Sequence, residues 1–231
     1  MPQQYVIATA KPWNIDAFHR RAPKLPGDWH LIEQAGQLTL ERLAILSPRY
    51  IFFPHWSWRV SNEILSQYEC VCFHMSDVPY GRGGSPLQNL IMRGHTSTML
   101  TALRMIDELD AGPIYLKQPL SLLGSAEDIF VRAADMVYDL IAEIVRNNPA
   151  PVPQVGEPVL FRRRAPEESR LPFEGTTSNL CDFIRMLDAP TYPKAFLTWG
   201  RLTLEFDQAR LADSGVLEAR VKIRQQKPDD R

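Results

Sequence analysis

Short apolar segments that alternate with stretches of helical spacing constrain the fold of this chain more than any other feature. Residues Tyr50–Pro54 form a continuous apolar run that ends at a proline, which is typical of a buried strand in a parallel sheet. Tyr5–Thr9 and Cys70–Phe73 are similar β-prone runs, and the segments 38–46 and 61–68 between them have helical spacing. This alternation predicts an α/β domain with a parallel sheet.

The pattern continues to about residue 150, with one interruption. Residues 77–86 (DVPYGRGGSP) are dense in glycine and proline, and we expect them to form a loop. Further elements are expected in chain order, namely a helix at 86–93, strands at 98–106 and 114–120, and a long helix at 125–147. Asp128 follows Ser125 by three residues, so the start of the long helix is close to a capping box.

A change in composition suggests that a second domain follows. Three prolines at 149–153 indicate a Pro-rich linker over 151–160, which would separate a domain of residues 1–150 from a small α+β appendage at 161–231. In the appendage we expect a helix at 177–187, a hairpin at Trp199–Gly200 and a strand at 215–223. The tail KPDDR is expected to be disordered.

Charge and cysteine content limit the classes of function. The chain has 231 residues, 26 basic and 27 acidic, and a net charge of −1. Nothing in this balance calls for a large polyanionic partner such as tRNA, although a small phosphate pocket stays open. The sequence has neither an 18-residue apolar stretch nor a signal peptide, so we expect a cytoplasmic protein without membrane contact. Three cysteines, an odd number, argue against a disulfide framework.

Three short motifs between residues 74 and 113 carry the chemical information. They consist of His74, Ser76 and Pro79, then Arg82, Gly83 and Pro86, then Asp110, Gly112 and Pro113. Asp110 lies 36 residues after His74 (110 − 74). In order and spacing, the motifs resemble those of the folate-dependent formyltransferases, and the similarity extends from about residue 45 to about residue 200. The segment YPKAF makes the chain most similar to the sugar N-formyltransferases, and the family implies a Rossmann-like, mostly parallel sheet.

The resemblance implies that His74 and Asp110 are catalytic. A histidine can take the proton of an attacking amine or donate to an oxyanion, and an aspartate can orient the imidazole. The family has an asparagine where this chain has Cys72, and a thiol is a weak donor. Gln88 or Asn89 could substitute for that asparagine, or His74 could act alone, or the protein could be slow or inactive. A covalent role for Cys72 is a further reading.

The resemblance also implies N10-formyltetrahydrofolate as co-substrate and no metal. The pterin is expected to contact two loops, through Phe53, Pro54, His55, Trp56, Met105, Asp107 and Leu109. The acceptor is expected to contact Ser76, Arg82, Gly83 and Gly84. Each of these positions also has a purely structural interpretation: the aromatic residues could belong to the core, and Arg82 could be a solvated loop cation.

The expected acceptor is the amine of a nucleotide-linked amino sugar used in polysaccharide biosynthesis. A tRNA acceptor would call for a larger basic C-terminal domain, and the purine-pathway member uses a glycine-rich N-terminal loop that is absent from AKPWN. Alternatives are an aminoacyl or hydroxyornithine amine in peptide biosynthesis, hydrolysis of formylfolate, and a catalytically impaired protein that binds folate or a nucleotide. A homodimer formed through the C-terminal segment stays open.

Overall fold

The computed structural model describes residues 2–225, which divide into two compact units. The first contains residues 2–86, 98–120 and 130–161, and the second contains residues 87–97, 121–129 and 162–225. Each unit therefore draws on several segments, whereas the sequence suggested contiguous domains at 1–150 and 161–231. Those boundaries stay a prediction, and the tail at 227–231 lies outside the described residues.

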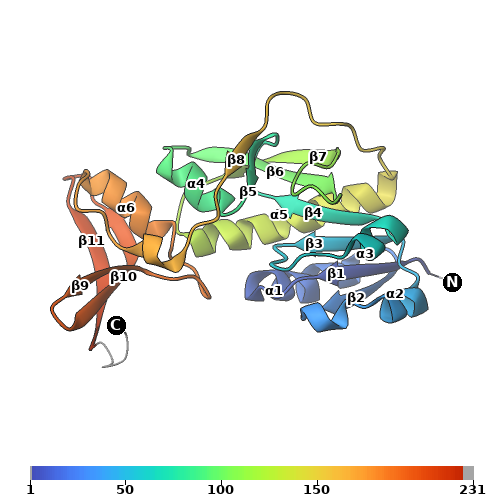
Figure 1. Cartoon of the computed structure of the whole chain (residues 1–231), viewed down its shortest axis with the longest axis horizontal. Helices are drawn as coiled ribbons and strands as arrows, with labels where there is room; N and C mark the ends of the chain where they lie inside the picture. Colours follow the sequence, from blue (N-terminus) through green and yellow to red (C-terminus); the bar gives the residue numbers. More distant parts are fainter. Residues whose placement is uncertain (1, 226–231) are drawn as a thin grey trace. The chain divides into compact units, whose positions relative to one another are not determined.

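A six-stranded sheet forms the centre of the first unit, in the order β2-β1-β3-β4-β6-β7 (Figure 1). The strands are β1 (Gln4–Ala8), β2 (Asp28–Ile32), β3 (Tyr50–Pro54), β4 (Cys70–His74), β6 (Ser97–Arg104) and β7 (Ile114–Ser121). β2, β1, β3 and β4 pair in parallel, and β6 runs antiparallel to β4. The predicted α/β class with a mostly parallel sheet is confirmed.

The helices that precede β3 and β4 begin at side-chain caps. α2 (Leu40–Leu46) follows Thr39, whose hydroxyl accepts from the Arg42 N–H, and α3 (Asn62–Gln67) follows Ser61. The expected long helix is α5 (Ala126–Asn147). α1 (Pro12–Arg21), β2 and the short 3₁₀ turns at 22–24 and 35–37 were not predicted from the sequence.

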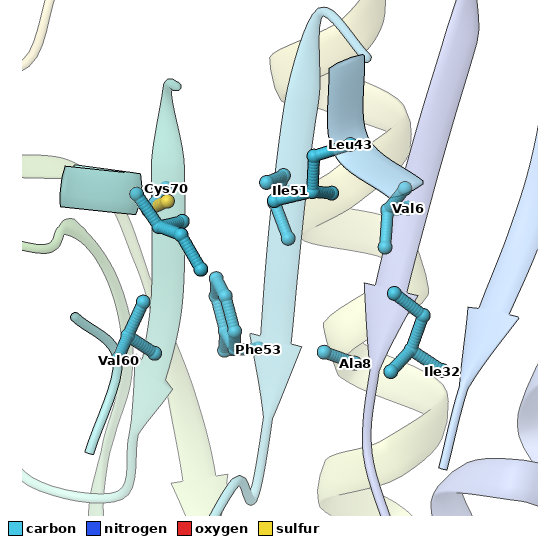
Figure 2. Close-up of a cluster of buried hydrophobic side chains, with 9 residues drawn as sticks. Val6, Ala8, Ile32, Leu43, Ile51, Phe53, Val60 and Cys70 are labelled. Atoms are coloured by element: carbon cyan, nitrogen blue, oxygen red, sulfur yellow. The ribbon is translucent and has the colours of Figure 1, made fainter. Parts of the chain in front are cut away.

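One face of the sheet is closed by α2 and α3. Figure 2 shows the buried cluster on this face, in which Val6 of β1, Ile51 of β3 and Cys70 of β4 belong to the same cluster as Leu43 of α2. The alternate residues point to the other face, where the Tyr50 hydroxyl donates to Asn148 Oδ1, just beyond α5, over 2.7 Å. Helices therefore cover both faces of the sheet, as in doubly wound α/β folds.

The glycine-rich segment 77–86 is not all loop. Residues Tyr80–Gly83 form β5, which pairs in parallel with β8 (Val159–Phe161), so the sequence-based prediction was wrong for these residues. Gly81 and Gly83 have φ values of +79° and +104°, and a Cβ on either would lie within 2.7 Å of Phe161 atoms. Here glycine allows two strands to approach closely, although its density in the sequence indicated a turn.

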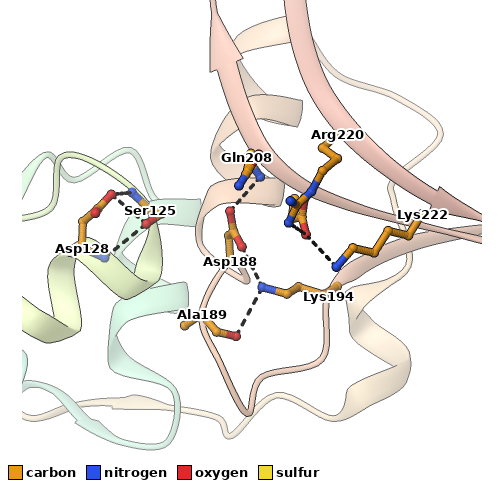
Figure 3. Close-up of polar contacts among 9 residues, drawn as sticks. Ser125, Asp128, Asp188, Ala189, Lys194, Gln208, Arg220 and Lys222 are labelled. Atoms are coloured by element: carbon orange, nitrogen blue, oxygen red, sulfur yellow. Dashed lines mark hydrogen bonds and ion pairs between the residues drawn. The ribbon is translucent and has the colours of Figure 1, made fainter. Parts of the chain in front are cut away.

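The second unit contains an antiparallel sheet and short helices. Its strands are β9 (Ala195–Trp199), β10 (Leu202–Leu211) and β11 (Leu217–Gln225), its helices are α4 (Pro86–Met92) and α6 (Thr177–Arg185), and a 3₁₀ turn spans 166–169. The expected hairpin, last strand and helix are all present. Figure 3 shows Asp188, which accepts from Lys194 Nζ and from the Gln208 N–H over 2.7 Å each. Within residues 2–225, no helix has both the length and the apolar composition to cross a membrane.

Candidate active site

His74 is the last residue of β4 and is held by a main-chain carbonyl. Its Nε2 lies 2.7 Å from the Gly81 carbonyl oxygen, and its Nδ1 lies 3.4 Å from Asp110 Oδ2. Because a carbonyl oxygen only accepts, Nε2 carries a hydrogen in this geometry. Nδ1 is therefore the nitrogen at which the neutral imidazole takes up a proton, and the resulting N–H would face a carboxylate.

Asp110 lies in the loop between β6 and β7 and faces His74 in an unusual backbone conformation. Its φ is +54°, and its Oδ2 accepts the Gly83 N–H over 3.0 Å. The side chains of Asp110 and His74 are only 10% and 9% exposed, so water screens their interaction weakly. The turn DAGP thus also places a carboxylate beside an imidazole.

Ser76 and Thr101 form hydrogen bonds that fix the main chain around His74. The Ser76 hydroxyl donates to the same Gly81 carbonyl over 3.1 Å, and the Thr101 hydroxyl donates to the Ser76 carbonyl over 2.8 Å. Ser76 is fully buried. The structure therefore uses Ser76, which was expected to contact the acceptor, to hold the segment that orients His74.

The other residues expected at the acceptor are all bound within the protein, and Gly83 contacts Asp110. Arg82 donates from Nε to Gln154 Oε1 over 3.0 Å and lies 3.3 Å from Glu108, with only 13% of its side chain exposed. The Gly83 N–H binds Asp110, and the Gly84 N–H binds the Phe161 carbonyl. Arg82 is therefore engaged within the protein and is not a solvated cation.

A cavity of about 100 Å³ lies on one side of Asp110, and His74 is not part of its lining. Its lining includes Cys72, Asp110 and the three expected pterin contacts of the second loop, Met105, Asp107 and Leu109. Most of the lining surface is apolar, supplied in part by Trp58, Leu65 and Leu103. Apolar lining is typical of small-molecule pockets, although this volume is below the roughly 300–1,000 Å³ of a typical ligand pocket.

The expected pterin contacts of the first loop fall into two groups. Phe53 is buried in the core, and Trp56 packs against it and against Trp58 of the cavity lining, with ring centroids 6.0 and 4.7 Å apart. Within residues 2–225, the buried Trp56 Nε1–H has no hydrogen-bond partner, so a donor is left over near the cavity. A ligand carbonyl could use it.

Pro54 and His55 turn toward α1 and α5 instead. The Pro54 carbonyl accepts from Asn14 Nδ2, and the His55 ring lies 5.4 and 4.9 Å from the rings of Trp13 and Phe130. Burial, with a smaller contribution from Lys11, lowers the pKa of His55 to about 3, so the ring is neutral near pH 7. Neither Pro54 nor His55 lines the cavity.

Cys72 does not have the properties of a nucleophile. Burial, and then the charge of Asp110, raise the pKa of its thiol far above the usual range, so the thiol stays protonated. The two carboxamides considered as replacements for the family asparagine are used in the second unit. Gln88 Nε2 donates to the Met186 carbonyl, and Asn89 Nδ2 donates to the Arg162 carbonyl, over 3.1 Å each.

Gln154 is a site residue that the sequence did not indicate. Its side chain binds the main chain on both sides of Ala111, at Asp110 and Gly112. It lies in the expected Pro-rich linker, where no periodic pattern or motif marks a single inward-facing amide. Within residues 2–225, no group of three or more His, Cys, Asp or Glu side chains is placed to hold a metal ion.

Sequence comparisons find similarity to methionyl-tRNA formyltransferases. A family model described as "Methionyl-tRNA formyltransferase, C-terminal domain" matches residues 166–224. Methionyl-tRNA formyltransferase of Bacillus pumilus is 23% identical over 226 residues, which are 94% of this chain and 69% of the relative. The Clostridium acetobutylicum protein of the same name is 25% identical over 76% of this chain and 59% of its own length, so the chain spans about three fifths to two thirds of these relatives.

Comparison with solved structures gives the family. The structure described as methionyl-tRNA formyltransferase from Clostridium thermocellum is 40% identical, has a TM-score of 0.93, and is matched over 96% of this chain and 99% of that one. HypX from Aquifex aeolicus in complex with tetrahydrofolic acid (16% identity, TM-score 0.74, 90% of this chain and 38% of that one) and a 4-N formyltransferase from Francisella tularensis (13%, 0.65, 94% and 96%) share the fold. The chain belongs to the folate-dependent formyltransferase family.

Proposed function

We propose that this protein transfers the formyl group of N10-formyltetrahydrofolate to a primary amine, with His74 and Asp110 at the reaction centre. The observation that carries the proposal is the position of the His74 imidazole. The Gly81 carbonyl fixes it through Nε2, and its Nδ1 lies 3.4 Å from the carboxylate of Asp110, which lines the cavity together with Cys72. Family membership supports a folate as the co-substrate.

The reaction forms a bond from the acceptor nitrogen to the formyl carbon and breaks the bond from that carbon to N10 of the folate. The amine loses one proton, and N10 gains one. In the proposed mechanism His74 takes the proton of the amine at Nδ1, and the charged ring is stabilised by Asp110. The Nδ1–H then supplies a proton toward N10 through water. In this account the Gly81 carbonyl orients the ring through Nε2 in both states, and Asp110 holds the charged ring once Nδ1 carries a proton.

For the acceptor we propose the amine of a nucleotide-linked amino sugar. The charge pattern of the last strand supports a small acceptor over a tRNA stem, because every cation of β11 has an acidic partner on β10. Arg220 binds both oxygens of Asp207 over 2.6 and 2.7 Å, Lys222 lies 3.8 Å from the same carboxylate, and Arg224 lies 3.1 Å from Glu205 (Figure 3 shows Arg220 and Lys222). Phosphate contacts to nucleic acid require cations that are not already neutralised.

A second acceptor, the amine of an aminoacyl-tRNA, is favoured by a different observation. The structure at 40% identity and the family model over 166–224 both carry the name of methionyl-tRNA formyltransferase. The chain also matches 94% of itself to a curated relative of that name. The 4-N formyltransferase from Francisella tularensis is 13% identical, so its likeness supports the fold alone.

One assay separates these acceptors. Purified protein with N10-formyltetrahydrofolate is offered UDP- and dTDP-linked 3-amino and 4-amino dideoxy sugars, methionyl-tRNA, or an N-hydroxyornithine peptide. Tetrahydrofolate release is followed by absorbance, and a mass gain of one formyl group identifies the product. We expect turnover on a nucleotide sugar that His74→Gln abolishes.

Each other outcome has one interpretation. Formylation of methionyl-tRNA alone would replace the sugar with the tRNA acceptor, and formylation of the peptide alone would favour peptide biosynthesis. Folate release without any amine would indicate a hydrolase. Binding of formylfolate without turnover on any acceptor would contradict the proposed activity and favour a binding protein impaired at Cys72.

A further inference from the structure

Gln154 makes three hydrogen bonds through its carboxamide, and all three partners belong to the candidate active site. Nε2 donates to the carbonyl oxygens of Asp110 and Gly112 over 2.8 Å each, and Oε1 accepts from Arg82 Nε over 3.0 Å. These contacts use both amide hydrogens and the oxygen. Gln154 is half-buried, whereas the flanking Pro153 and Val155 are exposed, so its side chain alone turns inward.

The two acceptor carbonyls belong to the part of the loop with the most constrained backbone. Asp110 has a φ of +54°, in the left-handed region that residues with a side chain adopt uncommonly. At Gly112 a Cβ would lie 1.8 Å from the Arg104 carbonyl oxygen. The Gln154 amide bonds the main chain on both sides of Ala111 and so stabilises the turn that places the Asp110 carboxylate against His74.

Arg82 joins this contact to the strand that binds the other side of Asp110. Its Nε orients the Gln154 oxygen, its Nη1 lies 3.3 Å from Glu108, and the next residue, Gly83, donates its N–H to Asp110 Oδ2. The loop is thereby fixed at Glu108, at both carbonyls and at the carboxylate. We call Gln154 with Arg82, Asp110 and Gly112 the Gln154 clamp.

We propose that Gln154 is a positioning residue for formyl transfer, acting through Asp110 to hold the carboxylate against His74 Nδ1. The effect of Gln154 on catalysis rests on the proposed function, whereas the hydrogen bonds of the Gln154 clamp do not depend on it. Without the amide, two carbonyls lose their donors and Asp110 can leave the left-handed region. A misplacement of about 1 Å in an active site can cost about 10²-fold in rate.

The test begins with Gln154→Leu, which keeps the size of the side chain and removes all three hydrogen bonds. We expect kcat to fall at least tenfold while KM for N10-formyltetrahydrofolate changes less than threefold. Gln154→Glu keeps the acceptor for Arg82 and removes the amide donors, so it should show the same kcat loss in a protein that folds. The matched control is Gln67→Leu. Gln67 is exposed at the end of α3, before β4, and His74 lies at the far end of that strand, so the same substitution is made away from the site.

A double-mutant cycle separates positioning from general stability. If Gln154 acts through Asp110, then Gln154→Leu added to Asp110→Asn should lower kcat less than twofold further. A purely structural role would lower kcat by the same factor in both backgrounds. Equal factors, or a wild-type kcat in Gln154→Leu, would overturn the proposal.

A readout without activity keeps this proposal separate from the proposed function. Amide hydrogen exchange followed by mass spectrometry should show faster deuterium uptake at residues 105–113 and 80–84 in Gln154→Leu, and wild-type uptake in Gln67→Leu. Unchanged uptake in Gln154→Leu would overturn the clamp whether or not the protein transfers formyl groups. Faster uptake in a protein inactive on every acceptor would leave the clamp standing and contradict the proposed function.

Discussion

Nδ1 of His74 lies 3.4 Å from Oδ2 of Asp110, although the two residues come from a strand end and from a loop 36 positions later (110 − 74). The distance is longer than a good hydrogen bond, which leaves the contact to tighten when the ring becomes charged. The Gly81 carbonyl fixes the opposite ring nitrogen, so the imidazole cannot turn its Nδ1 away. This relationship makes the pair suited to proton transfer.

Replacing Cys72 with the family asparagine tests the missing donor. Because burial keeps the thiol protonated and a thiol donates weakly, Cys72→Asn should raise kcat for formyl transfer at least about tenfold. Cys72→Ala is the control, and it should stay within about threefold of the wild-type rate. Loss of all activity in Cys72→Ala would instead support a covalent role for the thiol.

Gly112→Ala should destabilise the fold. The added Cβ would lie 1.8 Å from the Arg104 carbonyl oxygen, a main-chain atom that cannot move aside cheaply. We expect the free energy of unfolding in urea to fall by more than about 2 kcal/mol. At Gly36 an added Cβ would meet no side chain or main chain beyond its sequence neighbours within 4 Å, so Gly36→Ala should stay within about 0.5 kcal/mol of the wild type. Equal stability of the two variants would contradict the close approach.

His55 should make stability depend on acid. Its pKa is lowered to about 3 in the fold, so below about pH 6.5 the unfolded chain binds a proton that the folded chain does not. The free energy of unfolding should therefore fall as the pH drops from about 6.5 toward 3, by up to about 1.4 kcal/mol per pH unit from this residue. His55→Phe should flatten that slope in urea titrations, and a change at the exposed His19 to Phe should not. An unaltered slope in His55→Phe would show that the ring is not buried in its neutral form.

The strands that position the site were predictable, while the elements around them were less so. The run Tyr50–Pro54 is uniformly buried, and its apolar composition already identified it. α1 was missed because its buried face combines Trp13 and Ala17 with a polar residue, Asn14, so the apolar stripe is weak. β5 was missed because its glycines serve close strand packing, which a single sequence cannot distinguish from a turn.

The candidate site divides in the same way. Motif order and spacing singled out His74 and Asp110, and the structure places these two side chains in contact. Gln154 had no such signal, because its bonds reach main-chain oxygens 42 and 44 residues away, and main-chain acceptors leave no trace in residue identity. His55 was expected at the pterin because the family resemblance places the pterin at the loop after Phe53, but its left-handed backbone turns the ring toward Trp13 and Phe130.

The most direct test of the central claim is the rate of formyl transfer from N10-formyltetrahydrofolate in wild type, His74→Gln and Asp110→Asn. The acceptor is the one that the assay under Proposed function identifies. The account predicts that kcat falls at least about 10²-fold in His74→Gln and at least tenfold in Asp110→Asn, because both variants weaken proton transfer. KM for the folate should stay within about threefold in both. A wild-type kcat in folded His74→Gln would contradict the assignment of this pair as the reaction centre.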